Sequence, residues 1–365
     1  MSSLNLLKVF LLFFCFPHIG IGQQSLRLPK QEQIHQLFRY YEDERQFNGN
    51  ILIAEKGKVV YENAIGWANK DASVGLNLAT PFYLASISKS FTAIAIIQLE
   101  EKGKIDYDQK IDEFFPEMGS YGSKISIRNL LNHTSGLPDY FTMEWDETGV
   151  TNAQIYNKVL QNMRNLEFRP GYKYSYNNTG YILLALIVEK ASGLDFYEYI
   201  EKHICEPIGL ENTWVHDLRN PGILQKNRAI GYNFNMKKED DYDLLTWGDG
   251  GMYSTLEDLF IFDRALYDGS LISSQSLIVA YSPVLLAGGN TRNYGFGWVI
   301  GSNINGKVVS HTGGLAGFRN YFERQIEVEN TIIILTNNSN RDINNIRNTL
   351  VKILDGRPYT LPDAK

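Results

Sequence analysis

The chain has 365 residues, of which 44% are hydrophobic and 21% are charged, and this is the composition of a folded globular protein with a large core. Its formal net charge of −6 offers no basic surface for DNA or RNA, so we expect no nucleic-acid partner.

The first residues, 1–22, are typical of a secretory signal peptide. Lys8 precedes an apolar run from Val9 to Phe16, and small residues lead to a cleavage site before Gln23. The apolar run is too short to cross a bilayer. We therefore expect export to the periplasm or the medium, and a mature chain, 23–365, without a transmembrane span.

Hydrophobic periodicity predicts an amphipathic helix at 31–47, followed by a β-hairpin whose strands are 50–54 and 58–63. The polar segment 219–249 indicates a long surface loop, and Asn305-Gly306 is a strong hairpin turn. Further helices are expected at 86–102, 125–138, 151–166, 181–191, 195–204, 254–267 and 341–354, and further strands at 294–300, 307–311, 321–328 and 331–336.

Strands thus occur near both ends of the chain and helices lie between them. This order favours an α/β (α+β) fold, with one antiparallel sheet built from N- and C-terminal segments and flanked by the terminal helices. We expect one domain, with its α/β part at about 28–85 and 290–360. A helical subdomain would occupy about 86–285, and the cleft between the two parts would hold the start of the helix at residue 86.

That helix begins with Ser86-Ile-Ser-Lys89, the only Ser-x-x-Lys of the chain. Residues three apart share a helix face, so Lys89 can reach the Ser86 hydroxyl and act as the base that a serine nucleophile needs. The helix is apolar on nearly all sides, and burial disfavours the charged form of a lysine. A Ser-x-x-Lys also arises by chance about once in a chain of this length, so the motif alone does not establish catalysis.

Two later stretches could complete such a site. Tyr176 and Asn178 would point the same way from an extended loop, as a proton shuttle and as an amide that holds lysine and substrate. His311-Thr312-Gly313-Gly314 is expected to end a strand, with glycines that let a ligand approach the backbone. Each has an alternative interpretation, because a second Tyr-x-Asn occurs at 61–63 and a lone histidine is more often structural.

In this order, Ser86–Lys89, Tyr176–Asn178 and His311–Gly313 resemble the three motifs of the serine hydrolases with the β-lactamase and penicillin-binding fold. The similarity is strongest to the branch of class C β-lactamases, D,D-peptidases and esterases, and 133–138 and 250–258 also match stretches typical of it. The resemblance implies an acyl-enzyme on Ser86, with Lys89 and Tyr176 moving protons in an order that it leaves open. Asn178, His311, Thr312 and Gly313 would bind or support the substrate, and the backbone N–H groups of Ser86 and Gly314 would form the oxyanion hole. It implies no metal and no cofactor.

The chain departs from the pattern of β-lactamases at two positions. His311 stands where lysine is usual, and Gly314 stands where serine or threonine is common. Both changes remove groups that bind a substrate carboxylate, so we expect a small-molecule or peptide hydrolase of esterase or peptidase type with weak or no β-lactamase activity. Arg319 and Arg292 are the nearest arginines that could replace the missing contact.

Three alternatives remain: a D,D-carboxypeptidase, a class C-like β-lactamase, and a non-catalytic binder of penicillins or cell-wall peptides. Retention of Ser86, Lys89 and Tyr176 together favours an enzyme. The sequence indicates neither the natural substrate nor the oligomeric state.

Overall fold

The computed structural model of the protein describes residues 28–43, 47–146, 149–216, 227–239, 244–339 and 343–361. The signal peptide expected at 1–22 lies outside these ranges, as does part of the polar segment 219–249.

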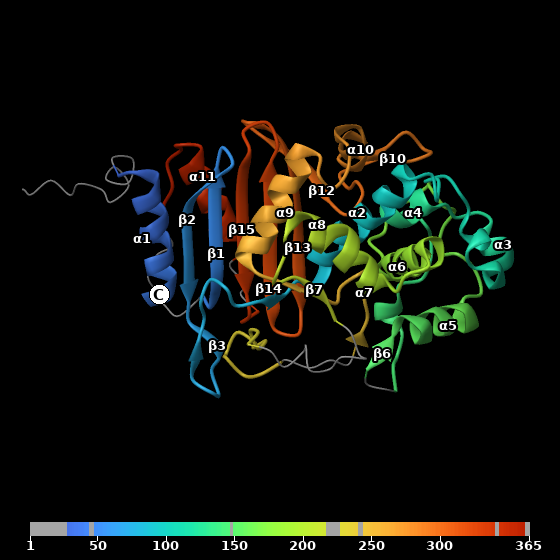
Figure 1. Cartoon of the computed structure of the whole chain (residues 1–365), viewed down its shortest axis with the longest axis horizontal. Coiled ribbons are helices and arrows are strands. Elements are labelled where there is room, and N and C mark those ends of the chain that lie inside the picture. Colours follow the sequence, from blue (N-terminus) through green and yellow to red (C-terminus); the bar gives the residue numbers. More distant parts are fainter. Residues whose placement is uncertain are drawn as a thin grey trace, which may run out of the picture.

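A six-stranded antiparallel sheet joins the two ends of the chain (Figure 1). Its strand order is β12-β13-β14-β15-β1-β2, and the N-terminal and C-terminal segments meet where β1 pairs with β15. The strands are β1 (Gly49–Glu55), β2 (Lys58–Ile65), β12 (Val299–Asn303), β13 (Gly306–Leu315), β14 (Phe318–Gln325) and β15 (Asn330–Thr336). The predicted sheet of N- and C-terminal segments is therefore confirmed.

Both faces of this sheet are covered, because apolar side chains alternate between them. In β15, Ile332 and Ile334 pack with α1 (Lys30–Asp43) and α11 (Ile343–Leu354) on one face. Their neighbours Ile333 and Leu335 face the larger core, which includes α2 (Ser88–Glu101) and α9 (Leu256–Asp268). Figure 1 shows α9 lying across the sheet.

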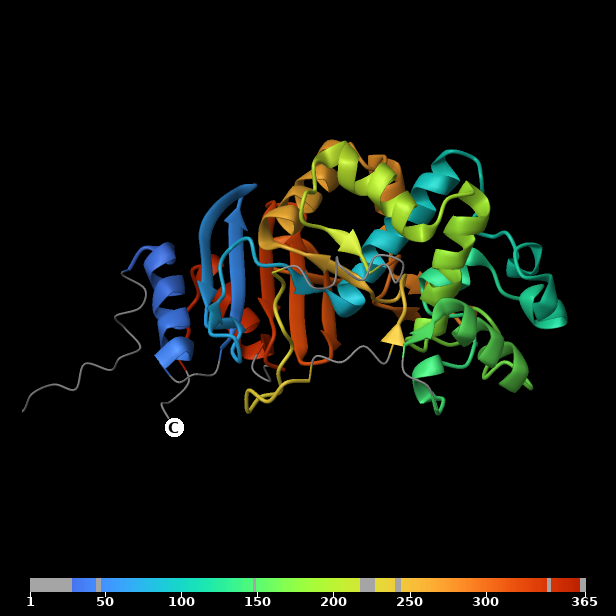
Figure 2. The same cartoon turned by 60° about the horizontal axis from the view of Figure 1, so that its bottom comes forward.

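The remaining helices gather at one side of the sheet, with α2 between them and the strands (Figure 2). They are α3 (Gly119–Gly122), α4 (Ile127–Leu131), α5 (Asn152–Asn162), α6 (Asn178–Ser192), α7 (Phe196–Ile200), the π-turn Glu201–Cys205, α8 (Glu206–Ile208) and α10 (Ser274–Ala280). Single 3₁₀ turns occur at η3 (Ala85–Ile87), η4 (Ile111–Glu113), η5 (Pro116–Met118) and η6 (Tyr140–Thr142). Within the described ranges, none of the helices combines the length and apolarity that a membrane crossing requires.

Short strands connect these parts. They are β3 (Trp67–Asn69), β4 (Val74–Gly75), β5 (Phe82–Tyr83), β6 (Val150–Thr151), β7 (Trp214–Val215), β8 (Leu244–Leu245), β9 (Met252–Ser254), β10 (Val284–Leu285) and β11 (Thr291–Arg292). The small sheet β5-β9-β7 matters most for the site, because β5 leads directly into the turn that carries Ser86.

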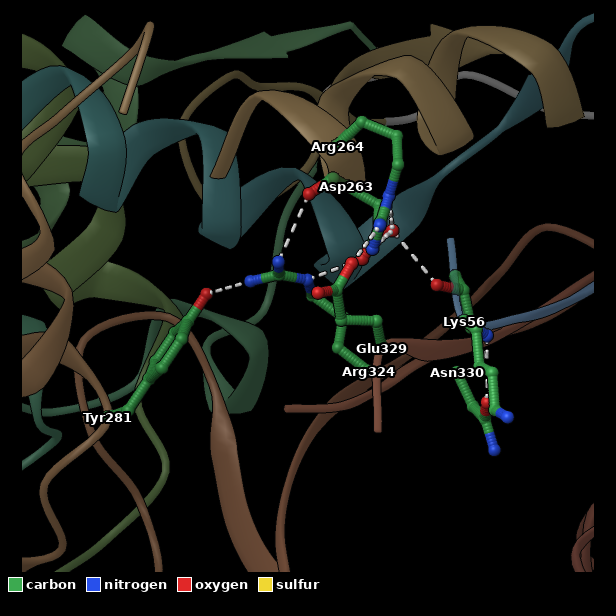
Figure 3. A network of polar contacts seen from close by, with 8 residues as sticks. Lys56, Asp263, Arg264, Tyr281, Arg324, Glu329 and Asn330 are labelled. Atoms are coloured by element: carbon green, nitrogen blue, oxygen red, sulfur yellow. Dashed lines mark hydrogen bonds and ion pairs between the residues drawn. The ribbon is translucent and has the colours of Figure 1, made fainter. Parts of the chain in front are cut away.

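A buried ion pair fixes α9 to the sheet (Figure 3). Arg324 of β14 is 1% exposed, and its Nε lies 2.5 Å from Oδ1 of Asp263 on α9. Arg324 also donates to the Asp263 backbone oxygen at 3.0 Å and to the Tyr281 hydroxyl, while Thr331 of β15 donates to Asp263 Oδ2 at 2.9 Å. These bonds satisfy two charges that would otherwise be costly to bury.

Several predicted boundaries were wrong. The helix expected at 125–138 is only Ile127–Leu131, and three further differences bear on the site. The strand expected at 294–300 begins only at Val299, because Gly297 turns with φ +78° and its position allows no side chain beside the Lys89 backbone oxygen. The strand expected to end at His311 continues to Leu315, so the glycines lie within β13. The helix expected from residue 181 begins at Asn178.

Candidate active site

Ser86 lies in a strained turn that the sheet approaches closely. The turn is the 3₁₀ segment Ala85–Ile87 just before α2, and not the first turn of the α-helix as predicted. Ala85 has φ +48°, a left-handed conformation that costs energy for a residue with a Cβ. A Cβ on Gly313 would lie 2.0 Å from the Leu84 backbone oxygen, so glycine lets β13 reach this turn.

Lys89 is fully buried and contacts Ser86 directly. Its Nζ lies 3.1 Å from Ser86 Oγ, 2.8 Å from Asn178 Oδ1 and 2.6 Å from the backbone oxygen of Asp249. The neighbouring Thr92 hydroxyl donates to the Gly248 backbone oxygen at 2.7 Å, which holds the Asp249 segment against α2. The structure thus brings together the serine, the lysine and the asparagine that the sequence singled out.

Tyr176 and Asn178 reach the lysine from two different kinds of backbone. Asn178 is the first residue of α6, because Asn177 caps the helix by accepting from the Gly180 N–H at 2.8 Å. Tyr176 precedes this cap, and its ring centroid is 5.0 Å from Lys89 Nζ. Among the described residues, the Tyr176 hydroxyl has no hydrogen-bond partner, and the side chain is 36% exposed. Tyr176 therefore lies in a loop, as expected, whereas Asn178 lies in the first turn of α6 and not in that loop.

His311 is buried and neutral. Its Nδ1 lies 2.7 Å from the Thr312 backbone oxygen, which can only accept, so Nδ1 carries the proton. Nε2 then accepts from the Tyr294 hydroxyl at 2.9 Å. Burial, followed by the nearby Lys89, lowers the pKa of His311 to about 3. Both ring nitrogens are engaged within the protein, so His311 offers no N–H to a substrate.

A cavity of about 690 Å³ opens on Ser86. Tyr176, Thr312, Gly313 and Gly314 line it with Ser86, so the three motifs share one space. The ladder between β12 and β13 ends at Val299 and Ser310, which leaves that edge of β13 open from His311 onward.

Arg319 also lines the cavity and is Gly314's cross-strand partner. A Cβ on Gly314 would lie 2.4 Å from Arg319 Nη1, so the absent side chain makes room for the guanidinium. Arg319 Nη1 donates to the Phe318 backbone oxygen at 3.1 Å. Arg292, the other arginine considered from the sequence, lies in β11 and is not part of this lining.

Two residues of the site were missed from the sequence. Asp139 accepts hydrogen bonds from Asn178, and Asp249 supplies the backbone oxygen that Lys89 contacts. The Asp249 carboxyl is buried, which raises its pKa, and its Oδ2 accepts from the Tyr140 hydroxyl at 2.6 Å. Asp139 directly follows the stretch 133–138 and Asp249 directly precedes 250–258, both noted for the resemblance. This adjacency is the feature of the sequence that could have revealed them.

A metal site is not found in the part of the chain that the structure describes, where no three His, Cys, Asp or Glu side chains group suitably.

Known proteins share both the sequence pattern and this architecture. Penicillin-binding protein 4* of Bacillus subtilis is 37% identical over 356 residues, which cover 92% of this chain and 78% of that protein. The octameric penicillin-binding protein homologue of Pyrococcus abyssi superposes with a TM-score of 0.78 at 26% identity, covering 90% of this chain and 78% of that one. The D-amino acid amidase of Ochrobactrum anthropi, in its complex with L-phenylalanine, shares the fold with a TM-score of 0.73 at 22% identity, covering 88% and 98%. The sequence profile described as Beta-lactamase matches residues 34–354, and the chain belongs to the beta-lactamase family.

Proposed function

We propose that the protein is an exported serine hydrolase that forms an acyl-enzyme on Ser86, of esterase or peptidase type and with weak or no β-lactamase activity. The observation that carries the proposal is the contact of 3.1 Å between Lys89 Nζ and Oγ of Ser86, a residue that lines the cavity. The names of the relatives, penicillin-binding proteins and an amidase, support acyl transfer to a serine.

The geometry supports a proton path through Lys89. Ser86 Oγ attacks the substrate carbonyl carbon, and its proton passes to Lys89 Nζ, the group in direct contact with it. The backbone N–H groups of Ser86 and Gly314 stabilise the oxyanion. Lys89 then passes the proton to the leaving group. Where the leaving atom lies nearer to the Tyr176 hydroxyl than to Lys89, the proton passes through Tyr176. A water molecule then attacks the acyl carbon and gives its proton to the same base. Ser86 Oγ leaves as the acyl group departs and regains its proton.

The substrate preference follows from the third motif. Neutral His311 has both nitrogens engaged, and Gly314 has no hydroxyl, so Thr312 is the motif's one side chain free to bind a substrate carboxylate. Hydrogen bonds to a charged group are worth about 1.5–3 kcal/mol each. Neutral esters and amides lose nothing by their absence, which favours them over anionic β-lactams.

A second candidate is a D,D-carboxypeptidase or β-lactamase that holds the substrate carboxylate with Arg319. The exposed guanidinium beside Gly314 in the same cavity favours it. The two candidates differ in the charge of the preferred substrate, so a matched pair of neutral and anionic substrates separates them.

The nucleophile is tested with a serine-directed fluorophosphonate and a labelled penicillin. We expect the fluorophosphonate to label Ser86 in wild type, and Ser86→Ala to remove both the label and the turnover of a chromogenic ester. Ser88→Ala is the matched control, because Ser88 is fully buried two residues further on and should leave labelling intact. A label on another serine would refute the assignment, and labelling without repeated turnover would indicate a binder.

Export is tested separately. When the full chain is produced with its leader in a bacterial host, N-terminal sequencing of the protein outside the cytoplasm should begin at Gln23. Retention of residues 1–22 in the cytoplasmic fraction would refute this part of the proposal.

A further inference from the structure

We propose that Asp139 is a positioning residue that fixes the amide of Asn178 in the orientation Lys89 needs; this rests on the proposed function of Ser86. Asp139 Oδ2 accepts from both the backbone N–H and the side-chain Nδ2 of Asn178, each at 3.1 Å. A carboxylate has only acceptors. The NH₂ group of Asn178 must therefore face Asp139, and its Oδ1 must face Lys89 at 2.8 Å.

This orientation determines what Lys89 can do for Ser86. Asn178 Oδ1 and the backbone oxygen of Asp249 are both pure acceptors, at 2.8 Å and 2.6 Å from Nζ. To take the proton of Ser86, Lys89 has to be in its neutral form, which has two N–H bonds and one lone pair. In that form the two acceptors take both N–H bonds. The lone pair is then left for the proton of the Ser86 hydroxyl, 3.1 Å away. With the amide reversed, an NH₂ group would meet the lysine donors, and one lysine N–H would turn towards Ser86.

The backbone around Asp139 is held independently of its carboxylate–amide contact. The Thr179 hydroxyl donates to the Pro138 backbone oxygen at 2.8 Å and accepts from the Tyr140 N–H at 2.9 Å. Asn177 Nδ2 donates to the Leu137 backbone oxygen at 2.8 Å. The loop is thus fastened to the start of α6 at three points, so a change at Asp139 acts on the Asn178 amide with the loop still in place.

An asparagine in place of Asp139 cannot do the work of the carboxylate. Asp139 Oδ1 accepts from the Phe141 N–H at 3.0 Å as the cap of η6, while Oδ2 faces the two donors of Asn178. Whichever way the substituted amide turned, its NH₂ would oppose an N–H. The amide of Asn178 would gain freedom to turn its own NH₂ towards Lys89.

The test is a double-mutant cycle read on the rate of Ser86 acylation and on kcat and KM. Asp139→Asn should slow acylation by about tenfold to a hundredfold, the scale of a misplaced catalytic group, with KM changed by less than about threefold. In an Asn178→Ala background, the same substitution should cost less than about twofold, because its target is gone. Asp195→Asn, which changes the capping residue of α7 away from the cavity, is the matched control and should leave both constants intact.

The outcomes separate this inference from the proposed function. Loss of acylation in Ser86→Ala with no effect of Asp139→Asn overturns the role of Asp139 alone, and equal losses in both backgrounds show that Asp139 does not act through Asn178. If the Ser86→Ala variant is still acylated at the rate of the wild type, the proposed function is overturned instead. If Asp139→Asn lowers the melting temperature more than Asp195→Asn does, the cycle is repeated with Asp139→Ala, which removes the acceptor without adding a donor. The effect of Asp139→Ala must then also depend on the presence of Asn178.

Discussion

Of the three polar neighbours of Lys89, only Ser86 carries a proton that the lysine can take. The others are the amide oxygen of Asn178 and the backbone oxygen of Asp249. We therefore expect Lys89→Ala to lower turnover by about 10²–10⁴, the usual loss when acid–base help is removed. Tyr176→Phe should lower it on the same scale, and the double variant should lose much less than the product of the two, because both serve one path.

Steady-state ester hydrolysis by the four proteins checks this prediction. Tyr172→Phe is the matched control, since Tyr172 is 49% exposed and is not among the residues that line the cavity. Strictly multiplicative losses would mean that Lys89 and Tyr176 act on separate steps.

The residue at position 314 sets the expected substrate preference. Losing one or two contacts to a carboxylate, at about 1.5–3 kcal/mol each, lowers kcat/KM roughly tenfold to a few thousandfold for anionic substrates. We expect kcat/KM for a short neutral ester to exceed that for a cephalosporin, and Gly314→Ser to shift the ratio towards the cephalosporin. The added Cβ meets only the flexible end of Arg319, which can move aside.

A wild-type preference for the cephalosporin would contradict this and assign the carboxylate contact to Arg319. Arg319→Gln should then lower kcat/KM for the anionic substrate selectively. Arg292→Gln is the matched control, because Arg292 is not part of the cavity lining.

At the scale of elements, the attachment of α9 to the sheet depends on the Asp263–Arg324 pair. Asp263→Ala would leave the guanidinium of Arg324 buried without its counter-charge, which costs about 3–5 kcal/mol of unfolding free energy. Urea denaturation measures it. Asp108→Ala is the control, because the Asp108–Arg128 pair has exposed side chains and should contribute at most about 1 kcal/mol. Equal effects of the two substitutions would refute the anchoring role.

Periodicity predicted the elements that local patterns determine. The hairpin β1–β2, helices α1 and α11, and strands β13 to β15 all formed in the segments that alternation or helical spacing indicated, although the ends of several, such as β13, differ. The start of β12 was mispredicted because the backbone at Gly295 and Gly297 packs closely against distant parts of the chain. A Cβ on Gly295, for example, would lie 2.0 Å from the Ala280 backbone oxygen. No local pattern contains such a contact.

The site shows the same division. Ser86, Lys89, Asn178 and the 311–314 stretch were found because each belongs to a short motif. Asp139 and Asp249 were missed because they act across 39 and 160 positions of the chain. The neutral state of His311 likewise depends on burial and on the nearby Lys89, an environment that only the assembled fold provides.

At the scale of the whole molecule, the site exists only when the parts meet. Ser86 comes from η3, Lys89 from the start of α2, Asn178 from α6, and Gly313 and Gly314 from β13 of the sheet. Two histidines, His133 and His311, are buried where these parts join, at 1% and 3% exposure. His133 accepts from the Asn177 N–H at 3.1 Å, which ties it to the tyrosine motif. Folding therefore places two neutral imidazoles close to a buried lysine.

This burial predicts how stability depends on pH. Burial, then Lys89, lowers the pKa of His311 to about 3, and burial, Lys89 and His311 lower the pKa of His133 well below its ordinary 6.5. Below pH 6.5 the unfolded chain binds a proton at each position and the folded protein does not, so the unfolding free energy falls as the pH falls. Each histidine contributes up to about 1.4 kcal/mol per pH unit, and His311 continues to do so until about pH 3.

Urea denaturation between about pH 5 and pH 7 checks this expectation, with His311→Asn as the variant. An asparagine does not titrate, so the slope of unfolding free energy against pH should decrease by up to about 1.4 kcal/mol per unit, with His133 supplying a similar remaining part. His35→Asn is the matched control, because it removes a histidine that is exposed on α1. A slope that His311→Asn does not change would mean that His311 accepts a proton within the folded protein, and the third motif would then offer a substrate carboxylate the charge that we have argued it lacks.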